Sequence, residues 1–257
     1  FIMHKKKTIF ISASSSGIGY YLAKGYKSVG YNVIINGKNL SKLKKASVSL
    51  DKCNYFLGDL TDKKKIKALI KKIKKKYKYI DVLICNLGSS NFNKNNDDFE
   101  HALKYNFYST TNLVNYSKTI LKKDVSKIIC ISSICGIEYI DGAPMGYSIA
   151  KSALNFYIKL ISKELANKKI TINGIVPGNI IFEGSTWDLK IKQNPLKTKK
   201  YIKDNVPTNK FGSTQNIFEI CKMLTENTDN FITGSLFRLD GGQTKSVWFI
   251  IFVNYKN

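Results

Sequence analysis

The sequence contains little arginine and little histidine, and both shortages narrow the classes of function that fit it. All but one of its 42 basic residues are Lys, the exception being Arg238, and the Lys residues are spread over most of the chain. Nucleic-acid-binding surfaces usually gather basic side chains on one face and use Arg for bidentate contacts. We therefore expect no nucleic-acid partner. With only His4 and His101 as imidazole ligands, we also expect no metal site.

Cysteine pairs and long apolar runs are also missing. The five Cys residues form an odd set without a CxxC spacing: Cys53, Cys85, Cys130, Cys135 and Cys221. This pattern predicts buried free thiols in a reducing, cytoplasmic location rather than a disulfide framework. The C-terminal tail, 246–257, holds an apolar run at 248–253 that is far too short to span a bilayer, so we expect no membrane partner.

The formal net charge of +24 has two interpretations. A composition rich in Lys and Asn accounts for it without any function. Alternatively, the charge attracts an anionic substrate such as a phosphorylated or carrier-bound acyl group.

Short apolar runs alternate with amphipathic segments along the chain. Strands are predicted at 8–12, 32–36, 54–57, 81–85, 127–132, 171–176 and 235–239. Helices are predicted at 17–28, 40–46, 63–77, 97–121, 145–165 and 214–224. This alternation is typical of βαβ units. It predicts an α/β protein in which residues 1–257 form a single doubly wound Rossmann domain, with a parallel sheet of about seven strands flanked by helices. The polar, Lys-rich stretch 179–210 is interpreted as a mobile flap over the pocket.

A turn rich in Ser and Gly follows the first predicted strand. Residues 11–19 read ISASSSGIG, and small residues at this place let the backbone approach a pyrophosphate at a helix N-terminus. The strict GxGxxG pattern is absent. Taken alone, the turn favours a dinucleotide site and a flexible loop about equally.

Tyr147 and Lys151 are four residues apart in a predicted helix, so they share one face. An ammonium close to the phenol favours the phenolate and lowers a Tyr pKa from its usual value of about 10. The spacing arises easily by chance in a chain with so many Tyr and Lys residues. Its place downstream of the Gly-rich turn and of Ser132 and Ser133 makes it informative.

Taken together, these elements resemble the short-chain dehydrogenase/reductase family from about residue 8 to residue 245. The Thr-Gly-x-x-x-Gly-x-Gly motif of that family reads here with Ser12 and Ala13 in the first two places and with both later Gly residues retained. The segment 85–88, Cys-Asn-Leu-Gly, resembles the family's Asn-Asn-Ala-Gly, with Cys85 and Leu87 as departures. The additional methyl of Ala13 demands a different backbone angle or displaces the cofactor.

The resemblance implies the catalytic residues Asn106, Ser133, Tyr147 and Lys151. Ser133 would bind the substrate carbonyl, Tyr147 would exchange a proton with it, and Lys151 would hold the nicotinamide ribose. Asn106 would link Lys151 to solvent through water. Ser132 is the competing assignment for the serine.

The resemblance also implies a set of residues that bind the cofactor. They are Ser12, Ser14, Ser16, Gly17, Ile18, Gly19, Lys38, Asp59, Leu60, Asn86, Gly88, Tyr147, Lys151, Pro177, Gly178 and Ile180. Asp59 would contact the adenine ring. The second strand is followed by no acidic residue, and Lys38 stands where it can pair with an additional phosphate. NADP(H) is therefore favoured over NAD(H).

The expected activity is that of an NADP-dependent oxidoreductase, which transfers hydride between a nicotinamide cofactor and a small-molecule or carrier-bound carbonyl or alcohol substrate. The resemblance is to 3-oxoacyl-(acyl carrier protein) reductases, with a sugar or polyol dehydrogenase and a catalytically idle dinucleotide-binding protein as alternatives. It implies a homodimer or homotetramer assembled through 97–121 and 145–165. Five residues are expected at the substrate pocket: Ile134, Cys135, Met145, Glu183 and Trp187.

Overall fold

Seven parallel strands form the central sheet of the computed structural model, which describes residues 6–90, 99–122 and 124–246. The strands are β1 (Thr8–Ile11), β2 (Asn32–Gly37), β3 (Asn54–Leu57), β4 (Val82–Cys85), β5 (Lys127–Ile131), β6 (Thr171–Pro177) and β9 (Leu236–Leu239). Their order is β3-β2-β1-β4-β5-β6-β9, and every neighbouring pair is parallel. The predicted doubly wound Rossmann sheet is therefore confirmed.

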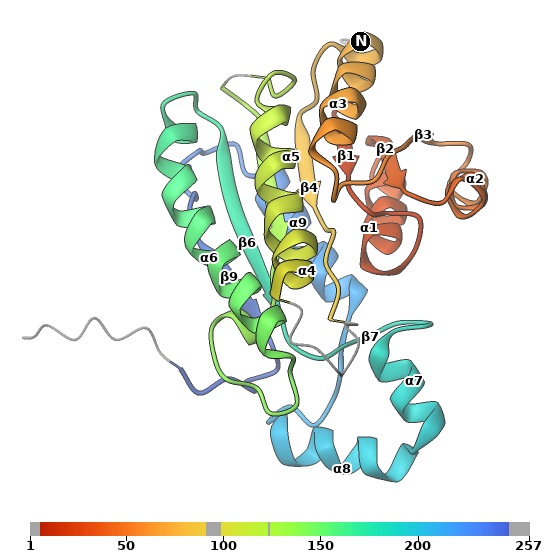
Figure 1. Cartoon of the computed structure of the whole chain (residues 1–257), viewed down its shortest axis with the longest axis vertical. Coiled ribbons are helices and arrows are strands. Elements are labelled where there is room, and N and C mark those ends of the chain that lie inside the picture. The colour runs from red at the N-terminus through yellow and green to blue at the C-terminus, as the bar shows by residue number, and fades with distance from the viewer. Residues whose placement is uncertain (1–5, 91–98, 123, 247–257) are drawn as a thin grey trace, which may run out of the picture.

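Helices cover both faces of this sheet (Figure 1). One face packs against α1 (Gly17–Ser28), α2 (Leu40–Ser49) and α9 (Thr214–Glu226), and the other against α3 (Lys63–Tyr77), α5 (Ser109–Ser117) and α6 (Met145–Ala166). Successive side chains of a strand point to opposite faces. Ile9 and Ile11 accordingly pack in the first cluster, whereas Phe10 packs in the second. Burial on both faces explains why these strands are continuous apolar runs.

The strand order reverses direction between β1 and β4, which are neighbours in the sheet. In open α/β sheets, ligands bind in the crevice outside the carboxyl ends of the strands at such a switch point. The segment after β1 is the Gly-rich turn, and the segment after β4 begins at Asn86. The topology therefore places these two segments side by side at one end of the sheet.

The prediction of a single helix at 97–121 is wrong in the middle of this segment and at its C-terminal end. Residues 97–98 lie outside the described residues. Helix α4 (Phe99–Leu103) passes into a π-helical turn, η1 (Lys104–Tyr108), before α5. Within η1 the Asn106 side chain donates to the carbonyls of Ala102 and Ser89. After α5 the chain leaves the helix, because Leu121 forms a bridge with Ile80 beside β4.

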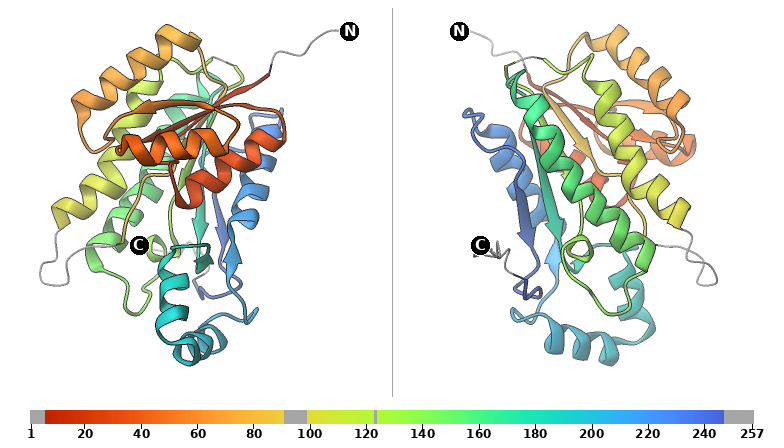
Figure 2. Two further views of the ribbon diagram at one scale, coloured as in Figure 1. Left: turned by 90° about the vertical axis from the view of Figure 1, so that its right-hand side faces the viewer. Right: turned by 60° about the vertical axis from the view of Figure 1, so that its left-hand side comes forward.

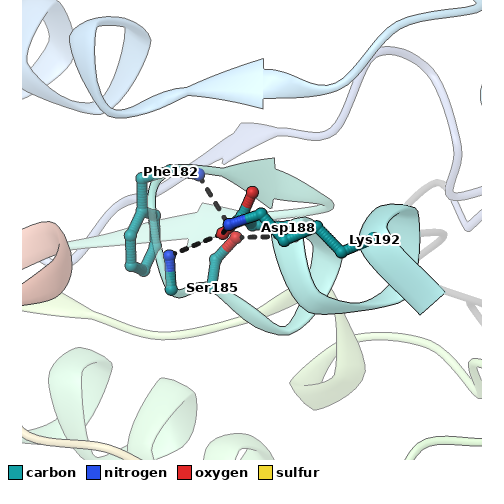
Figure 3. Close-up of polar contacts among 5 residues, drawn as sticks. Phe182, Ser185, Asp188 and Lys192 are labelled. Atoms are coloured by element: carbon teal, nitrogen blue, oxygen red, sulfur yellow. Dashed lines mark hydrogen bonds and ion pairs between the residues drawn. The ribbon is translucent and has the colours of Figure 1, made fainter.

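The predicted flap contains two helices that its weak periodicity did not indicate, α7 (Thr186–Gln193) and α8 (Pro195–Asn205). Two short strands, β7 (Ile180–Ile181) and β8 (Gly212–Ser213), pair at its base. Figure 3 shows how the first turn of α7 is fixed: the Ser185 hydroxyl accepts from the amides of Phe182 and Asp188. The Asp188 carboxylate in turn accepts from the Gly184 amide and from Lys192. Local capping therefore sets this helix.

None of the helices in the described ranges combines the length and the apolarity needed to cross a bilayer. Within the same ranges, no group of three or more His, Cys, Asp or Glu side chains is arranged to hold a metal ion. All five Cys residues are free thiols, and four of them are buried.

Candidate active site

Buried polar side chains brace the turn between β1 and α1. The Ser14 hydroxyl donates to the Ile11 carbonyl at 2.7 Å and accepts from the Asn36 amide at 3.0 Å. The Ser12 hydroxyl accepts from the Asn86 amide at 2.8 Å. Both hydroxyls are fully buried. The side chains of Ser12 and Ser14 therefore hold the turn together, and only their backbone remains available to a cofactor.

The turn requires close packing and an unusual backbone angle. Ala13 has a φ of +48°, which explains why the family motif has Gly at this place, since a non-Gly residue costs about 1–2 kcal/mol there. A Cβ atom on Gly19 would lie 2.5 Å from the Asn86 amide nitrogen and 2.7 Å from the Ala13 carbonyl oxygen. The Asn86 side chain also donates to the Ala13 carbonyl at 3.1 Å. Asn86 thus supports the turn as well as facing the cleft.

A cleft of about 450 Å³ opens at the carboxyl ends of the strands. Its walls include most of the predicted site: Ile18, Asn86, Gly88, Ser133, Ile134, Cys135, Tyr147, Lys151, Pro177, Gly178, Ile180 and Trp187. These residues come from segments more than 150 residues apart along the chain. The fold therefore gathers three of the four predicted catalytic residues and much of the predicted cofactor set around one space.

The two serine candidates differ in what their hydroxyls contact. The Ser133 hydroxyl accepts from the Cys135 amide at 3.2 Å, and Ser133 lines the cleft together with Tyr147. The Ser132 hydroxyl donates to the Asn155 side chain at 2.6 Å, and both of these residues are buried. The geometry favours Ser133 as the residue that meets a substrate, with Ser132 as part of the support.

Lys151 is almost completely buried, with 2% of its surface exposed. Its ammonium donates to the Ile131 carbonyl at 2.9 Å and lies 5.7 Å from the centre of the Tyr147 ring. Within the described part of the chain, no carboxylate forms an ion pair with it. Burial disfavours the charged form and lowers the pKa of Lys151 to about 8.

The predicted lowering of the Tyr147 pKa by Lys151 is wrong for this structure. Burial raises the pKa of Tyr147 to about 12, although the nearby Ser133 hydroxyl acts in the opposite direction. Removing the phenolate from water costs more free energy than its neighbours supply, because the Lys151 ammonium is already bonded to the Ile131 carbonyl. Tyr147 is therefore a neutral phenol at physiological pH.

Asn106 is fully buried and lies behind Gly88 rather than among the residues that line the cleft. Its carboxamide accepts from the Ser89 amide at 3.0 Å and donates to the Ser89 carbonyl at 2.9 Å. A Cβ atom on Gly88 would lie 2.9 Å from the Asn106 oxygen and 3.0 Å from the Lys151 nitrogen. Asn106 and Lys151 therefore meet at Gly88, where no larger residue fits. The sequence indicated Asn106 only through the family resemblance.

The residues predicted near the adenine behave differently from one another. The Lys38 ammonium donates to the Tyr105 hydroxyl at 3.2 Å, and this bond raises the pKa of Lys38. Asp59 accepts from the amide and the hydroxyl of Thr61, so it also caps its own turn. The side chain of Leu60 is buried in the core on the α3 side, so only its backbone is left to meet a cofactor, and its predicted contact stays a prediction. Nothing in the sequence indicated that Tyr105 is the partner of Lys38.

The substrate end of the cleft corrects two expectations. Met145 is 58% exposed and lies outside the cleft walls. Glu183 is exposed and borders a different hollow of about 420 Å³ beside the Gly-rich turn. Trp187 does line the cleft, where it packs 4.9 Å from Tyr201 and 5.3 Å from Phe211, measured between ring centres. Tyr201 was missed because the helix that carries it was not predicted.

Comparisons with known proteins agree with this geometry. The family profile described as "Enoyl-(Acyl carrier protein) reductase" matches residues 12–244. A 3-oxoacyl-[acyl-carrier-protein] reductase FabG of Rickettsia prowazekii is 31% identical over 246 residues, covering 92% of this chain and 96% of that protein. The FabG of Thermotoga maritima is 27% identical and covers 92% and 97%.

Solved structures show the same fold. ElxO with NADP bound is 27% identical, with a TM-score of 0.84 over 93% of this chain and 99% of that one. The Pseudomonas aeruginosa RhlG/NADP complex is 21% identical, with a TM-score of 0.83 over 92% and 95%, and supports the fold alone.

The chain belongs to the short-chain dehydrogenase/reductase family. It is an oxidoreductase of the class that uses a nicotinamide dinucleotide and acts on CH–OH groups.

The cleft suits a dinucleotide. Gly17, with a φ of +60°, and Gly19 keep the start of α1 free of side chains, so its first amides are available to a pyrophosphate. Gly88 carries no Cβ that would crowd Asn106 and Lys151, and Gly178 packs closely against Asp240. The residues present therefore fit this cofactor.

Replacing Lys151 by Met tests the cost of the buried ammonium. The folded-state pKa of about 8 lies below the usual value, so the cost is fully present below pH 8 and disappears as pH rises toward 10.5. We expect the free energy of unfolding of the variant to exceed that of the wild type by about 2 kcal/mol at pH 7. This value allows for the cost of leaving the Ile131 carbonyl without a donor. Urea denaturation at pH 7 and pH 10 measures this difference. The advantage of the variant should fall by about 2 kcal/mol or more at pH 10, because most of the charge cost is lost there while the unsatisfied carbonyl remains.

The exposed Lys159, on the same helix, provides the control, since Lys159→Met should change stability little at either pH. A Lys151→Met variant that is less stable than the wild type by the same amount at both pH values contradicts the burial argument.

Proposed function

We propose that this protein is an NADPH-dependent reductase of 3-oxoacyl thioesters, delivered on an acyl-carrier protein. The observation that carries the proposal is that Ser133 and Tyr147 line one cleft beside the buried Lys151. The names of the FabG relatives support the substrate class. The apolar and aromatic wall formed by Ile134, Trp187 and Tyr201 suits an acyl chain.

The side chains are arranged to reduce a carbonyl. The bound cofactor supplies hydride to the carbonyl carbon. Ser133 orients the carbonyl oxygen by a hydrogen bond, and Tyr147 donates a proton to it. The phenol is protonated at neutral pH and so has a proton to donate, although burial raises its pKa to about 12 and makes it a weaker acid than an exposed Tyr. General acid catalysis of this kind contributes about 10²–10⁴-fold to the rate.

The preference for NADPH rests on the end of β2. Residues 36–39 read NGKN, without a carboxylate to hold the ribose hydroxyls, and Lys38 is exposed there. An ammonium has three donors, so Lys38 can keep its bond to Tyr105 and still bind a phosphate. The similar ElxO structure has NADP bound, which supports the same choice.

A substrate panel tests the activity directly. We expect the purified protein to oxidise NADPH with a short 3-oxoacyl thioester, and to leave enoyl thioesters and sugars or polyols essentially unchanged. Absorbance at the NADPH band follows each reaction. Turnover only with an enoyl thioester, only with a sugar or polyol, or with none of these compounds contradicts the proposal. The last result would favour the catalytically idle dinucleotide-binding protein.

Lys38→Ala tests the cofactor preference. Loss of a charge-assisted hydrogen bond costs about 1.5–3 kcal/mol, so the Kd for NADPH should rise by about tenfold or more while that for NADH stays the same. Titration of nucleotide fluorescence measures both constants. Lys24→Ala, an exposed change on α1, is the control. Equal weakening of NADPH and NADH binding by Lys38→Ala would argue against the assignment.

We further propose a homodimer or homotetramer in the cytoplasm. Helix α6 carries exposed apolar side chains on one side, at Ile149, Phe156 and Leu160, which are 46%, 67% and 55% exposed. Their spacings of four and seven residues keep them on one face, as an isologous contact requires. Sedimentation equilibrium should give a dimer or tetramer, and a monomer at micromolar concentration would contradict this assembly. The five free thiols suit a reducing compartment.

A further inference from the structure

The outer face of α8 presents a short stripe of basic and apolar side chains. Leu196, Lys199, Lys200 and Lys203 occupy positions i, i+3, i+4 and i+7, which lie on one side of a helix. All four are exposed, and Leu196 is 82% exposed. We call these four residues the α8 face.

The opposite side of the same helix is fixed to the protein. Thr198 and Ile202 are buried, and Tyr201 lines the cleft beside Trp187 and Lys190. The α8 face and the wall of the cleft are therefore two sides of one helix, separated by a helix diameter of about 10 Å. A molecule held on the α8 face lies next to the mouth of the cleft.

The nearby acidic groups leave the α8 face positive. Asp204 pairs with Lys200 at 3.2 Å, whereas Asp188 is bonded to Lys192 and to the Gly184 amide. Within the described ranges, neither Lys199 nor Lys203 forms an ion pair with a carboxylate. Two such ammonium groups beside an exposed Leu suit an acidic helix that also carries an apolar side chain.

We propose that the α8 face is the docking surface for the acidic carrier protein that delivers the acyl group. This inference rests on the proposed function and adds to it the place where the partner binds. The carrier docks by charge complementarity with Lys199 and Lys203 and packs on Leu196. Its thioester arm then crosses only the width of α8 to enter the cleft, whose wall there is formed by Trp187 and Tyr201.

If net charge alone decided where an acidic partner binds, the partner would bind to α3 rather than to α8. Helix α3 carries more Lys than α8 and holds no acidic residue. The two views in Figure 2 place α3 at the end of the molecule opposite to α7 and α8. A partner on α3 is therefore far from the cleft, so docking can be separated from general attraction to a basic protein.

The test compares two matched pairs of charge reversals. Lys199→Glu with Lys203→Glu changes the α8 face, and Lys67→Glu with Lys71→Glu makes the same i, i+4 change on the exposed side of α3. Each protein is assayed with a 3-oxoacyl group on an acidic acyl-carrier protein and with the same group on N-acetylcysteamine. We expect the α8 pair to raise the KM for the carrier-bound substrate about tenfold or more at low salt. The kcat/KM for the small thioester should stay unchanged, and the α3 pair should change either value less than twofold.

Three results would overturn the docking surface. One is an unchanged KM for the carrier-bound substrate in the α8 pair. Another is an equal effect of the α3 pair, which would show general charge attraction. The third is a loss of kcat/KM that is equal for both substrates and that also occurs in the milder Lys199→Gln, Lys203→Gln pair. If the wild type fails to reduce the small thioester, the proposed activity is wrong. The docking surface is then tested by titrating the carrier protein onto the wild type and onto both charge-reversal pairs and comparing the Kd values.

Discussion

A lysine ammonium held in the interior by one backbone carbonyl is the interaction on which the catalytic end of this protein depends. Lys151 of α6 donates to Ile131, the last residue of β5, so the bond fixes the register between helix and strand. Tyr147 lies one helical turn earlier and is brought to Ser133, which follows β5 almost directly. The ammonium is costly to bury, as the fall of its pKa to about 8 shows. Burial of Lys151 therefore lowers the stability of the protein, while its bond to Ile131 positions Tyr147, the proton donor.

Around this bond, neutral polar side chains hold the ends of the strands in position. Ser12 joins β1 to the segment after β4 through Asn86, and Asn36 joins β2 to the end of β3 through the Phe56 and Gly58 carbonyls. Ser132 joins β5 to α6 through Asn155. Each of these contacts is buried or partly buried, where an unpaired partner is costly. They define the walls of the cleft without adding charge, so Lys151 remains the dominant charge beside the catalytic hydroxyls.

Much of the fold could be predicted from the sequence because its signals are local. Alternating apolar runs and amphipathic helices predicted all seven strands of the central sheet, and the bounds of α1 and α3 agree with prediction. The π-helical turn could not be predicted in this way, since it depends on Asn106 contacts with Ser89, which lies outside the helix. Helix α7 was missed because it is short and is set by the Ser185 cap rather than by periodicity.

The site was predicted more unevenly. Its residues were collected from motifs and a family resemblance, and the fold brings most of them to one cleft. The direction of the Tyr147 pKa was wrong, because spacing reveals a neighbouring charge but not the depth of burial. The places of Met145 and Glu183 depend on how the surrounding loops turn, which no local pattern encodes.

The central claim is that the Tyr147 phenol donates the proton to a carbonyl held by Ser133. Its most direct test is the rate of NADPH-dependent reduction by Tyr147→Phe, measured together with NADPH binding by the same protein. The account predicts a loss of at least about 10²-fold in kcat with an unchanged Kd for NADPH, because only the acid is removed. Turnover within a few-fold of the wild type would contradict it.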